Sequence, residues 1–313
     1  MGDWEFIKRR TAADGEVWRS ADGVLYKRTG DQSVAAEADF QRRAAQLGYP
    51  VPQILADGFE GSAEGGRHFF TEHSLGEASL HDAALAGADA QGQVPEDVVD
   101  AAAAISGHLL AAQARSPLPG GVREVRAWIE QAGFTANVFA ENPDLDTPRT
   151  HAALDRVVER LRDVPMCHSH LDYGLPNAFP TGVIDWQHHG PAPLGYDVYP
   201  MLDIVAFKGG GKGYRISPAQ RARYLLALDS AALEAYGRPL SGYLPDFLLV
   251  KCLFFLALMR PADPQRRDKH LKWHYRRALF QMGLEHYEDY TTIDTAAFPT
   301  LAEFTAGAAT TTR

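Results

Sequence analysis

The pattern of apolar residues changes near residue 75, and this change constrains the fold more than any other feature of the sequence. The first 75 residues contain short segments with β-type content, WEFIKRR (4–10), EVWRS (16–20) and GVLYKRT (23–29), separated by the turn signal ADG. Long Ala- and Leu-rich stretches with helical periodicity follow. Strands segregated from helices predict an α+β protein with two lobes, a small antiparallel sheet followed by a larger helical lobe.

The expected boundaries follow from this division. We expect an N-terminal lobe over residues 1–75, a helical lobe over 76–300 and a disordered tail over 301–313, where EFTAGAATTTR is low in complexity. In the first lobe we expect a helix over 33–47, with Ser33 as its N-cap and Gly48 as its end, and two further strands at 53–59 and 67–72. The long helices are expected at 94–115, 149–162, 218–236, 243–259 and 268–287, interrupted by strand-like sequence only at 164–186.

Composition excludes several classes of protein. The formal net charge of −9 argues against a nucleic-acid binder, which needs a basic face. The two cysteines, Cys167 and Cys252, rule out a disulfide scaffold and fit a reducing, cytoplasmic compartment. The N-terminal MGDWEFIKRR has no apolar core typical of a secretory signal. The most apolar stretch, 248–259, is too short to span a bilayer, so we expect no membrane partner.

The segments HSHLDYGLPN (168–177) and GVIDW (182–186) contain the clearest chemical signal. Asp172 is followed five residues later by Asn177, and Asp185 lies at the end of a short apolar strand. Phosphoryl transfer from ATP needs one carboxylate for the acceptor hydroxyl, and an amide and a second carboxylate for magnesium. An isolated Asp–Asn pair is typical of a turn, but the addition of Asp185 favours the catalytic interpretation.

A lysine and a helix glutamate complete the expected set. GVLYKR supplies Lys27 on the third expected strand, and SVAAEADFQRR supplies Glu37 on the following helix. A lysine can neutralise the α- and β-phosphates of a nucleotide, and a glutamate can hold that lysine in place. Each residue alone is equally compatible with an exposed surface position.

These residues, in this order, resemble the aminoglycoside phosphotransferase and choline kinase-like superfamily of small-molecule kinases. The similarity lies in the series H-x-D-x-x-x-x-N, IDW and YD, formed by His170, Asp172, Asn177, Ile184–Trp186 and Tyr196–Asp197. HFFTEHSLGEASL (68–80) is similar to that family's strand, hinge and first helix of the second lobe. The similarity extends in order from Lys27 to Asp197, and the rest of the helical lobe matches only in type.

The resemblance implies a protein kinase-like fold and an ATP- and Mg²⁺-dependent O-phosphotransferase, with GTP as an alternative donor. It implies the following roles: Asp172 as the catalytic base, Asn177 and Asp185 as magnesium ligands, Lys27 as the phosphate contact, Glu37 as its brace, Phe70, Glu72 and His73 at the adenine edge, and His170 and Asp197 as supports of the catalytic loop. The sequence departs from the family pattern in three places. Leu171 stands where the family usually has glycine, the hairpin between Asn177 and Asp185 is unusually short, and only Gly15 and Gly23 are available for a phosphate loop.

Two other functions stay open. HSHLD reads as H-x-H-x-D, a pattern that holds zinc in some hydrolases, and His188 or His189 could add a ligand to His168, His170 and Asp172. That interpretation leaves Asn177 and Lys27 unexplained and lacks the repeated strands of such hydrolases. The departures at Leu171 and in the phosphate loop instead favour a catalytically inactive homologue that binds a nucleotide or ligand.

The expected acceptor is a hydroxylated small molecule, such as an aminoglycoside or another antibiotic. Acidic side chains of the helical lobe would recognise a cationic acceptor, and the candidates are Asp203, Glu285, Glu288 and Asp289. The net charge of −9 is compatible with a cationic ligand. Macrolides, choline-like alcohols, sugars and amino alcohols stay open, because a pocket built from helices has no readable code.

Overall fold

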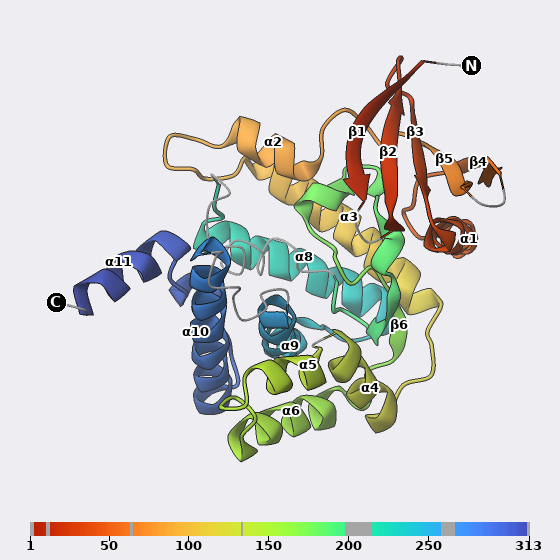
Figure 1. Cartoon of the computed structure of the whole chain (residues 1–313). Helices are drawn as coiled ribbons and strands as arrows, with labels where there is room; N and C mark the ends of the chain where they lie inside the picture. Colours follow the sequence, from red (N-terminus) through yellow and green to blue (C-terminus); the bar gives the residue numbers. More distant parts are fainter. Residues whose placement is uncertain are drawn as a thin grey trace.

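A five-stranded antiparallel sheet forms most of the N-terminal lobe (Figure 1) of the computed structural model, which describes residues 3–10, 13–62, 65–132, 134–197, 214–257 and 267–311. Its spatial order is β1 (Trp4–Arg10), β2 (Gly15–Ser20), β3 (Leu25–Gly30), β5 (Arg67–His73) and β4 (Ile54–Glu60). The predicted strands are therefore present, and β5 is an interior strand paired on both edges.

Helix α1 (Gln32–Gln46) covers one face of this sheet. Val34 and Ala38 of α1 pack with Ala13 and Phe70 into a small apolar cluster. The N-cap is Asp31 rather than the expected Ser33, because the Asp31 carboxylate accepts the backbone N–H of Ser33 at 2.8 Å. The helix therefore begins slightly earlier than its apolar pattern suggests.

The helical lobe lies below the sheet in Figure 1 and is built around a central buried helix. Its helices are α2 (Leu80–Gly87), α3 (Glu96–Arg115), α4 (Val122–Ala132), α5 (Thr135–Glu141), α6 (Pro148–Leu161), α8 (Pro218–Tyr236), α9 (Leu244–Ala257), α10 (Arg267–Tyr290) and α11 (Leu301–Thr311). Helix α9 contacts α4, α5, α6 and α10. It is apolar on nearly all sides, and such a helix has to be buried.

Short strands and 3-10 turns lie between the two lobes. They are β6 (Met166–Ser169) paired with β9 (Gly190–Pro193), β7 (Ala178–Phe179) paired with β8 (Gly182–Val183), and the turns η2 (Leu175–Asn177) and η3 (Trp186–His188). Phe40 of α1 joins this segment to the sheet lobe. Its ring stacks on His189 at 3.8 Å between centroids and lies 5.4 Å from Trp186.

The chain from residue 301 to 311 is a helix, so the prediction of a disordered tail is wrong. Thr300 and Glu303 cap its first turn: the Glu303 carboxylate accepts the Thr300 N–H at 2.7 Å, and Thr300 Oγ1 accepts the Glu303 N–H at 3.2 Å. Leu301 and Phe304 pack against the main core, and the Phe304 ring lies 5.6 Å from Tyr275. Sequence reasoning also missed the shorter helices α4 and α5.

Within the described residues, no single helix is long and apolar enough to cross a membrane. Helices α8 and α9 together pass the same test of length and composition, but the pair is bent by 110°. Most of α9 is also buried against other helices of the lobe.

Replacing Phe304 by alanine tests whether α11 is part of the folded core. We expect Phe304→Ala to lower the free energy of unfolding by about 1–3 kcal/mol, because it removes a partly buried ring. Urea unfolding measures the change. Leu226→Ala is the control, since Leu226 is 69% exposed. Equal small effects of both substitutions would mean that α11 does not pack as described.

Candidate active site

The loop that follows β6 is held from two sides. The buried Asp197 carboxylate accepts the backbone N–H of His170 at 2.5 Å and that of Leu171 at 3.1 Å. The Nε2 atom of His170 contacts the carbonyl oxygen of Ile184 at 2.8 Å, which joins the loop to the segment before Asp185. Burial raises the pKa of Asp197, and the neighbouring His170 opposes that rise. His170 and Asp197 thus fix the position of the loop, and neither of them lines the cavity into which Asp172 faces.

Asp172, Asn177 and Asp185 line one cavity of about 210 Å³. Asn177 lies at the end of η2 and donates its Nδ2–H to the carbonyl oxygen of Asp172 at 3.0 Å. This hydrogen bond fixes the amide and turns its oxygen away from that carbonyl. Lys8, from β1, lines the same cavity. Strand β1 of the sheet lobe therefore meets the segment 172–185, which is distant from it in sequence, around one small space.

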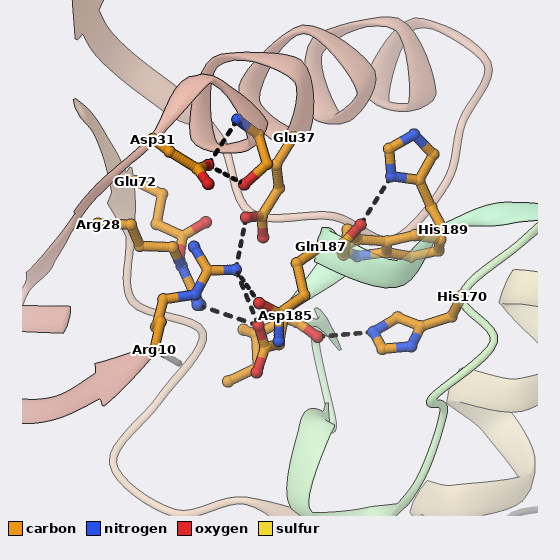
Figure 2. Close-up of polar contacts among 12 residues, drawn as sticks. Arg10, Arg28, Asp31, Glu37, Glu72, His170, Asp185, Gln187 and His189 are labelled. Atoms are coloured by element: carbon orange, nitrogen blue, oxygen red, sulfur yellow. Dashed lines mark hydrogen bonds and ion pairs between the residues drawn. The ribbon is translucent and has the colours of Figure 1, made fainter. Parts of the chain in front are cut away.

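Three cations surround Asp185, as Figure 2 shows for the two arginines. Arg10 Nη2 and Arg28 Nη1 approach Oδ1 at 3.3 and 3.5 Å, and Lys8 Nζ lies 3.6 Å from Oδ2. Burial by itself would raise the pKa of Asp185, but Arg28, Arg10 and Lys8 outweigh burial and lower it to about 2. Asp185 is therefore anionic at neutral pH.

Each arginine also holds a buried glutamate of the sheet lobe. Arg10 Nη2 contacts Glu37 of α1 at 2.6 Å, and Arg28 Nε contacts Glu72 of β5 at 2.6 Å (Figure 2). Burial raises the pKa of Glu72, and Arg28 counteracts it. The arginines thus link the hairpin that presents Asp185 to both α1 and the sheet.

The predicted pairing of Lys27 with Glu37 is wrong. Lys27 Nζ instead contacts the Glu60 carboxylate at 2.6 Å and lies 4.8 Å from the centre of the Phe69 ring. Successive residues of a strand face opposite sides of the sheet, so Lys27 and its neighbour Arg28 cannot both reach Asp185. Arg28 takes the inward position, and Glu37 pairs with Arg10.

The predicted adenine edge at Phe70, Glu72 and His73 is not supported by the strand pairing. These residues belong to β5, whose backbone is paired with β3 on one edge and β4 on the other. The His73 N–H donates to the carbonyl oxygen of Gln53 at 3.0 Å. Phe70 is fully buried under α1, and the Glu72 side chain is held by Arg28.

The histidines do not form the zinc cluster considered above. His170 contacts Ile184, whereas the ring of His168 lies against Phe40 at 5.6 Å. His189 is stacked on the same Phe40 ring. In the part of the chain that the structure describes, no group of three His, Cys, Asp or Glu side chains is placed to hold a metal ion.

A second cavity of about 330 Å³ meets the first at Asp172. Both cavities are lined by Leu171, Asp172, Tyr196 and Phe254. The second is also lined by Trp128, Gln131, Phe134, His188 and Pro191. The first cavity is the more polar of the two, because Asn177, Asp185 and Lys8 line it and do not line the second.

Three of the four predicted acidic substrate contacts do not line these cavities. Asp203 lies outside the described residues. Glu285, Glu288 and Asp289 line neither cavity, and Glu288 forms an ion pair with Arg149.

Comparison with known proteins agrees with this geometry. The sequence profile of the Phosphotransferase enzyme family (APH) matches residues 17–240. The chain belongs to this family. No curated protein sequence matches it.

Solved structures of the same fold are distant in sequence. A putative aminoglycoside phosphotransferase from Ralstonia eutropha JMP134 is 13% identical, with a TM-score of 0.57 over 92% of this chain and 93% of that one. A thermostable mutant of aminoglycoside phosphotransferase APH(4)-Ia, in a ternary complex with AMP-PNP and hygromycin B, is 15% identical, with a TM-score of 0.55 over 93% and 95% of the two chains. The predicted kinase-like α+β fold is therefore confirmed.

Sequence reasoning missed three basic residues of this phosphotransferase, Lys8, Arg10 and Arg28. A usable signal was present in IKRR, where Lys8 and Arg10 are two residues apart and so project from one face of a strand. For Arg28 the signal was ambiguous. The sequence has two adjacent basic residues on β3, and the side that each faces depends on strand pairing.

Substituting Arg10 tests the buried network. Arg10→Ala leaves Glu37 without its ion-pair partner, and we expect a loss of about 3–5 kcal/mol in the free energy of unfolding. Lys27→Ala is the matched control and should change it by less than about 1 kcal/mol, because Lys27 pairs with the exposed Glu60. The double variant Arg10→Met with Glu37→Gln should recover part of the loss. Similar losses for Arg10→Ala and Lys27→Ala would contradict the assignment.

Proposed function

We propose that this protein transfers the γ-phosphate of ATP to a hydroxyl group of a small molecule in a magnesium-dependent reaction. The observation that supports it most is the convergence of Asp172, Asn177 and Asp185 on one cavity. Membership of the phosphotransferase family and the kinase-like fold agree with it. AMP-PNP and hygromycin B are bound by the APH(4)-Ia relative, which makes ATP and a hydroxylated acceptor reasonable choices here.

The reaction would follow from the placement of Asp172. The acceptor oxygen attacks the γ-phosphorus, the bond from that phosphorus to the bridging oxygen breaks, and ADP leaves with the electron pair. The Asp172 carboxylate orients the hydroxyl and accepts its proton. Lys8, whose side chain is 55% exposed and lines the cavity, is placed to contact a phosphate.

The side chains around the cavity fit a magnesium ion. Both arginines contact Oδ1 of Asp185, so among the described residues Oδ2 contacts only the exposed Lys8 and is accessible from the cavity. An amide oxygen from Asn177 and a carboxylate oxygen from Asp185 are the hard ligands that Mg²⁺ prefers. Asn177 and Asp185 would hold the ion, which would neutralise negative charge that develops during transfer. A cytoplasmic location agrees with Cys167 and Cys252, which are buried free thiols.

An inactive, nucleotide-binding homologue is the second candidate. The observation that favours it is the neutralisation of Asp185 by three cations, with which a metal ion has to compete. Such a protein would bind nucleotide without hydrolysing or transferring its phosphate.

Asp172→Asn tests the role of the base. We expect it to abolish phosphate transfer and also the slower hydrolysis of ATP, since an amide cannot accept the proton. The affinity for Mg–AMP-PNP should stay within about threefold, because Asp172 is not assigned to the nucleotide. ADP release and calorimetric titration measure the two quantities. Turnover that survives in Asp172→Asn would remove Asp172 from the mechanism.

Asp185→Asn tests the metal site. In a thermal-shift titration with AMP-PNP, the wild-type protein should show a rise in Tm that requires magnesium, because ligands that bind the native state stabilise it. Asp185→Asn should lose the magnesium dependence. Asp57→Asn is a control, because Asp57 pairs with Arg42 on the sheet lobe and lines neither cavity. A wild-type shift that is equal with and without magnesium would argue against Asp185 as a metal ligand.

A further inference from the structure

The second cavity is positioned where an acceptor would have to bind. It meets the first cavity at Asp172, and Asn177 and Asp185 lie only on the other side. In the proposed reaction, the base lies between the phosphate and the acceptor hydroxyl. A molecule in the second cavity would therefore present its hydroxyl to Asp172. Its volume of about 330 Å³ is within the range of small-molecule sites.

The walls of this cavity are mainly aromatic. Trp128 is buried and packs edge-on against Tyr196 at 5.1 Å, while Phe134 and Phe254 stack at 6.1 Å. Leu171 and Pro191 add aliphatic surface, and Gln131 and His188 add polar atoms. Such walls favour a flat apolar group, because rings gain both buried area and ring–ring contacts.

The same walls would bind a polycation weakly. Among the described lining residues, Asp172 is the only carboxylate. Several ammonium groups buried against aromatic and aliphatic walls would leave most of their charge without a partner, which is costly. Cation–π contacts with a few rings offset only a part of that cost.

Most of the non-glycine residues with a left-handed backbone lie at these two cavities, within the described part of the chain. In the described part of the chain, five residues other than glycine have a positive φ, and three of them are Phe134, Leu171 and Asp185. Leu171 has φ +65° and Phe134 has φ +49°, and each places an apolar side chain on the second cavity. A left-handed backbone costs such residues roughly 1 kcal/mol or more, so its occurrence here points to a role in shaping the site.

We propose, on the basis of the phosphotransferase function above, that the acceptor is an uncharged and largely apolar alcohol with a flat ring close to the hydroxyl. Phe134, Phe254 and Leu171 determine this specificity. The ring lies between the Phe134–Phe254 pair and Trp128, and the hydroxyl points to Asp172. A polycationic sugar is bound less tightly than this alcohol.

Calorimetric titration of the full chain with 2-(2-naphthyl)ethanol and with hygromycin B tests this specificity. With magnesium and AMP-PNP present, we expect the naphthyl alcohol to bind and hygromycin B to bind more weakly or not at all. Phe134→Ala should weaken the naphthyl alcohol about tenfold, since it removes one stacked ring. Phe134 is 43% exposed, so the variant should fold. Leu226→Ala is the control and should bind the alcohol like the wild type.

Leu171→Gly provides a second test that does not depend on Phe134. Glycine adopts a positive φ without strain, so Tm should change little while the affinity for the naphthyl alcohol falls. AMP-PNP affinity should be unchanged in Phe134→Ala, because Phe134 lines only the second cavity.

The outcomes separate the two proposals. Absence of magnesium-dependent nucleotide binding in the wild type would refute the phosphotransferase function. Normal nucleotide binding with tighter binding of hygromycin B than of the naphthyl alcohol would refute the apolar acceptor alone. Unchanged binding of the alcohol in both Phe134→Ala and Leu171→Gly would also refute it.

Discussion

The ion pairs between Asp185 and the arginines of the sheet are the contacts on which the rest of the site depends. Asp185 lies in the segment between the lobes, whereas Arg10 and Arg28 belong to β1 and β3. Each arginine also contacts a buried glutamate, Glu37 or Glu72. An unpaired charge in such a buried position is strongly destabilising, so the pairs require one another. The lobes are thereby held in a definite arrangement around the cavity.

The apolar contacts of α1 also hold the two lobes together, through burial rather than through ion pairs. Val34 and Ala38 face the sheet, and Phe40 reaches Trp186 and His189 in the segment next to Asp185. One helix therefore positions Glu37 against Arg10 and also packs on the loop that presents the candidate metal ligand. Burial is non-directional, whereas the ion pairs select one geometry. Together they explain why a small sheet lobe can be attached firmly to a larger helical one.

Periodicity in the sequence predicted the long elements well and the site less completely. Helix α8 was predicted with its observed bounds from its helical periodicity, and the structure shows that Ser217 caps its start. The face that each β3 residue presents was not predictable, because one residue of register separates Lys27 from Arg28. The helical C-terminus was missed, although Thr300 and Glu303 form a readable capping box, because the composition around it is simple. The loop motif identified three residues that line one cavity, because Asp172, Asn177 and Asp185 are close in sequence. Arg10, by contrast, is 175 residues from Asp185.

The ion-pair network around Asp185 indicates how a nucleotide would be accepted. The three carboxylates Glu37, Glu72 and Asp185 face the three cations Lys8, Arg10 and Arg28. The two arginines are buried and form ion pairs with glutamates. Lys8 is exposed, and of the two carboxylate oxygens of Asp185 it contacts Oδ2. Lys8 can therefore leave Asp185 at little cost, since exposed ion pairs are weak. Its departure would free one carboxylate oxygen for a metal ion and one ammonium group for a phosphate, while the buried pairs keep the backbone in place.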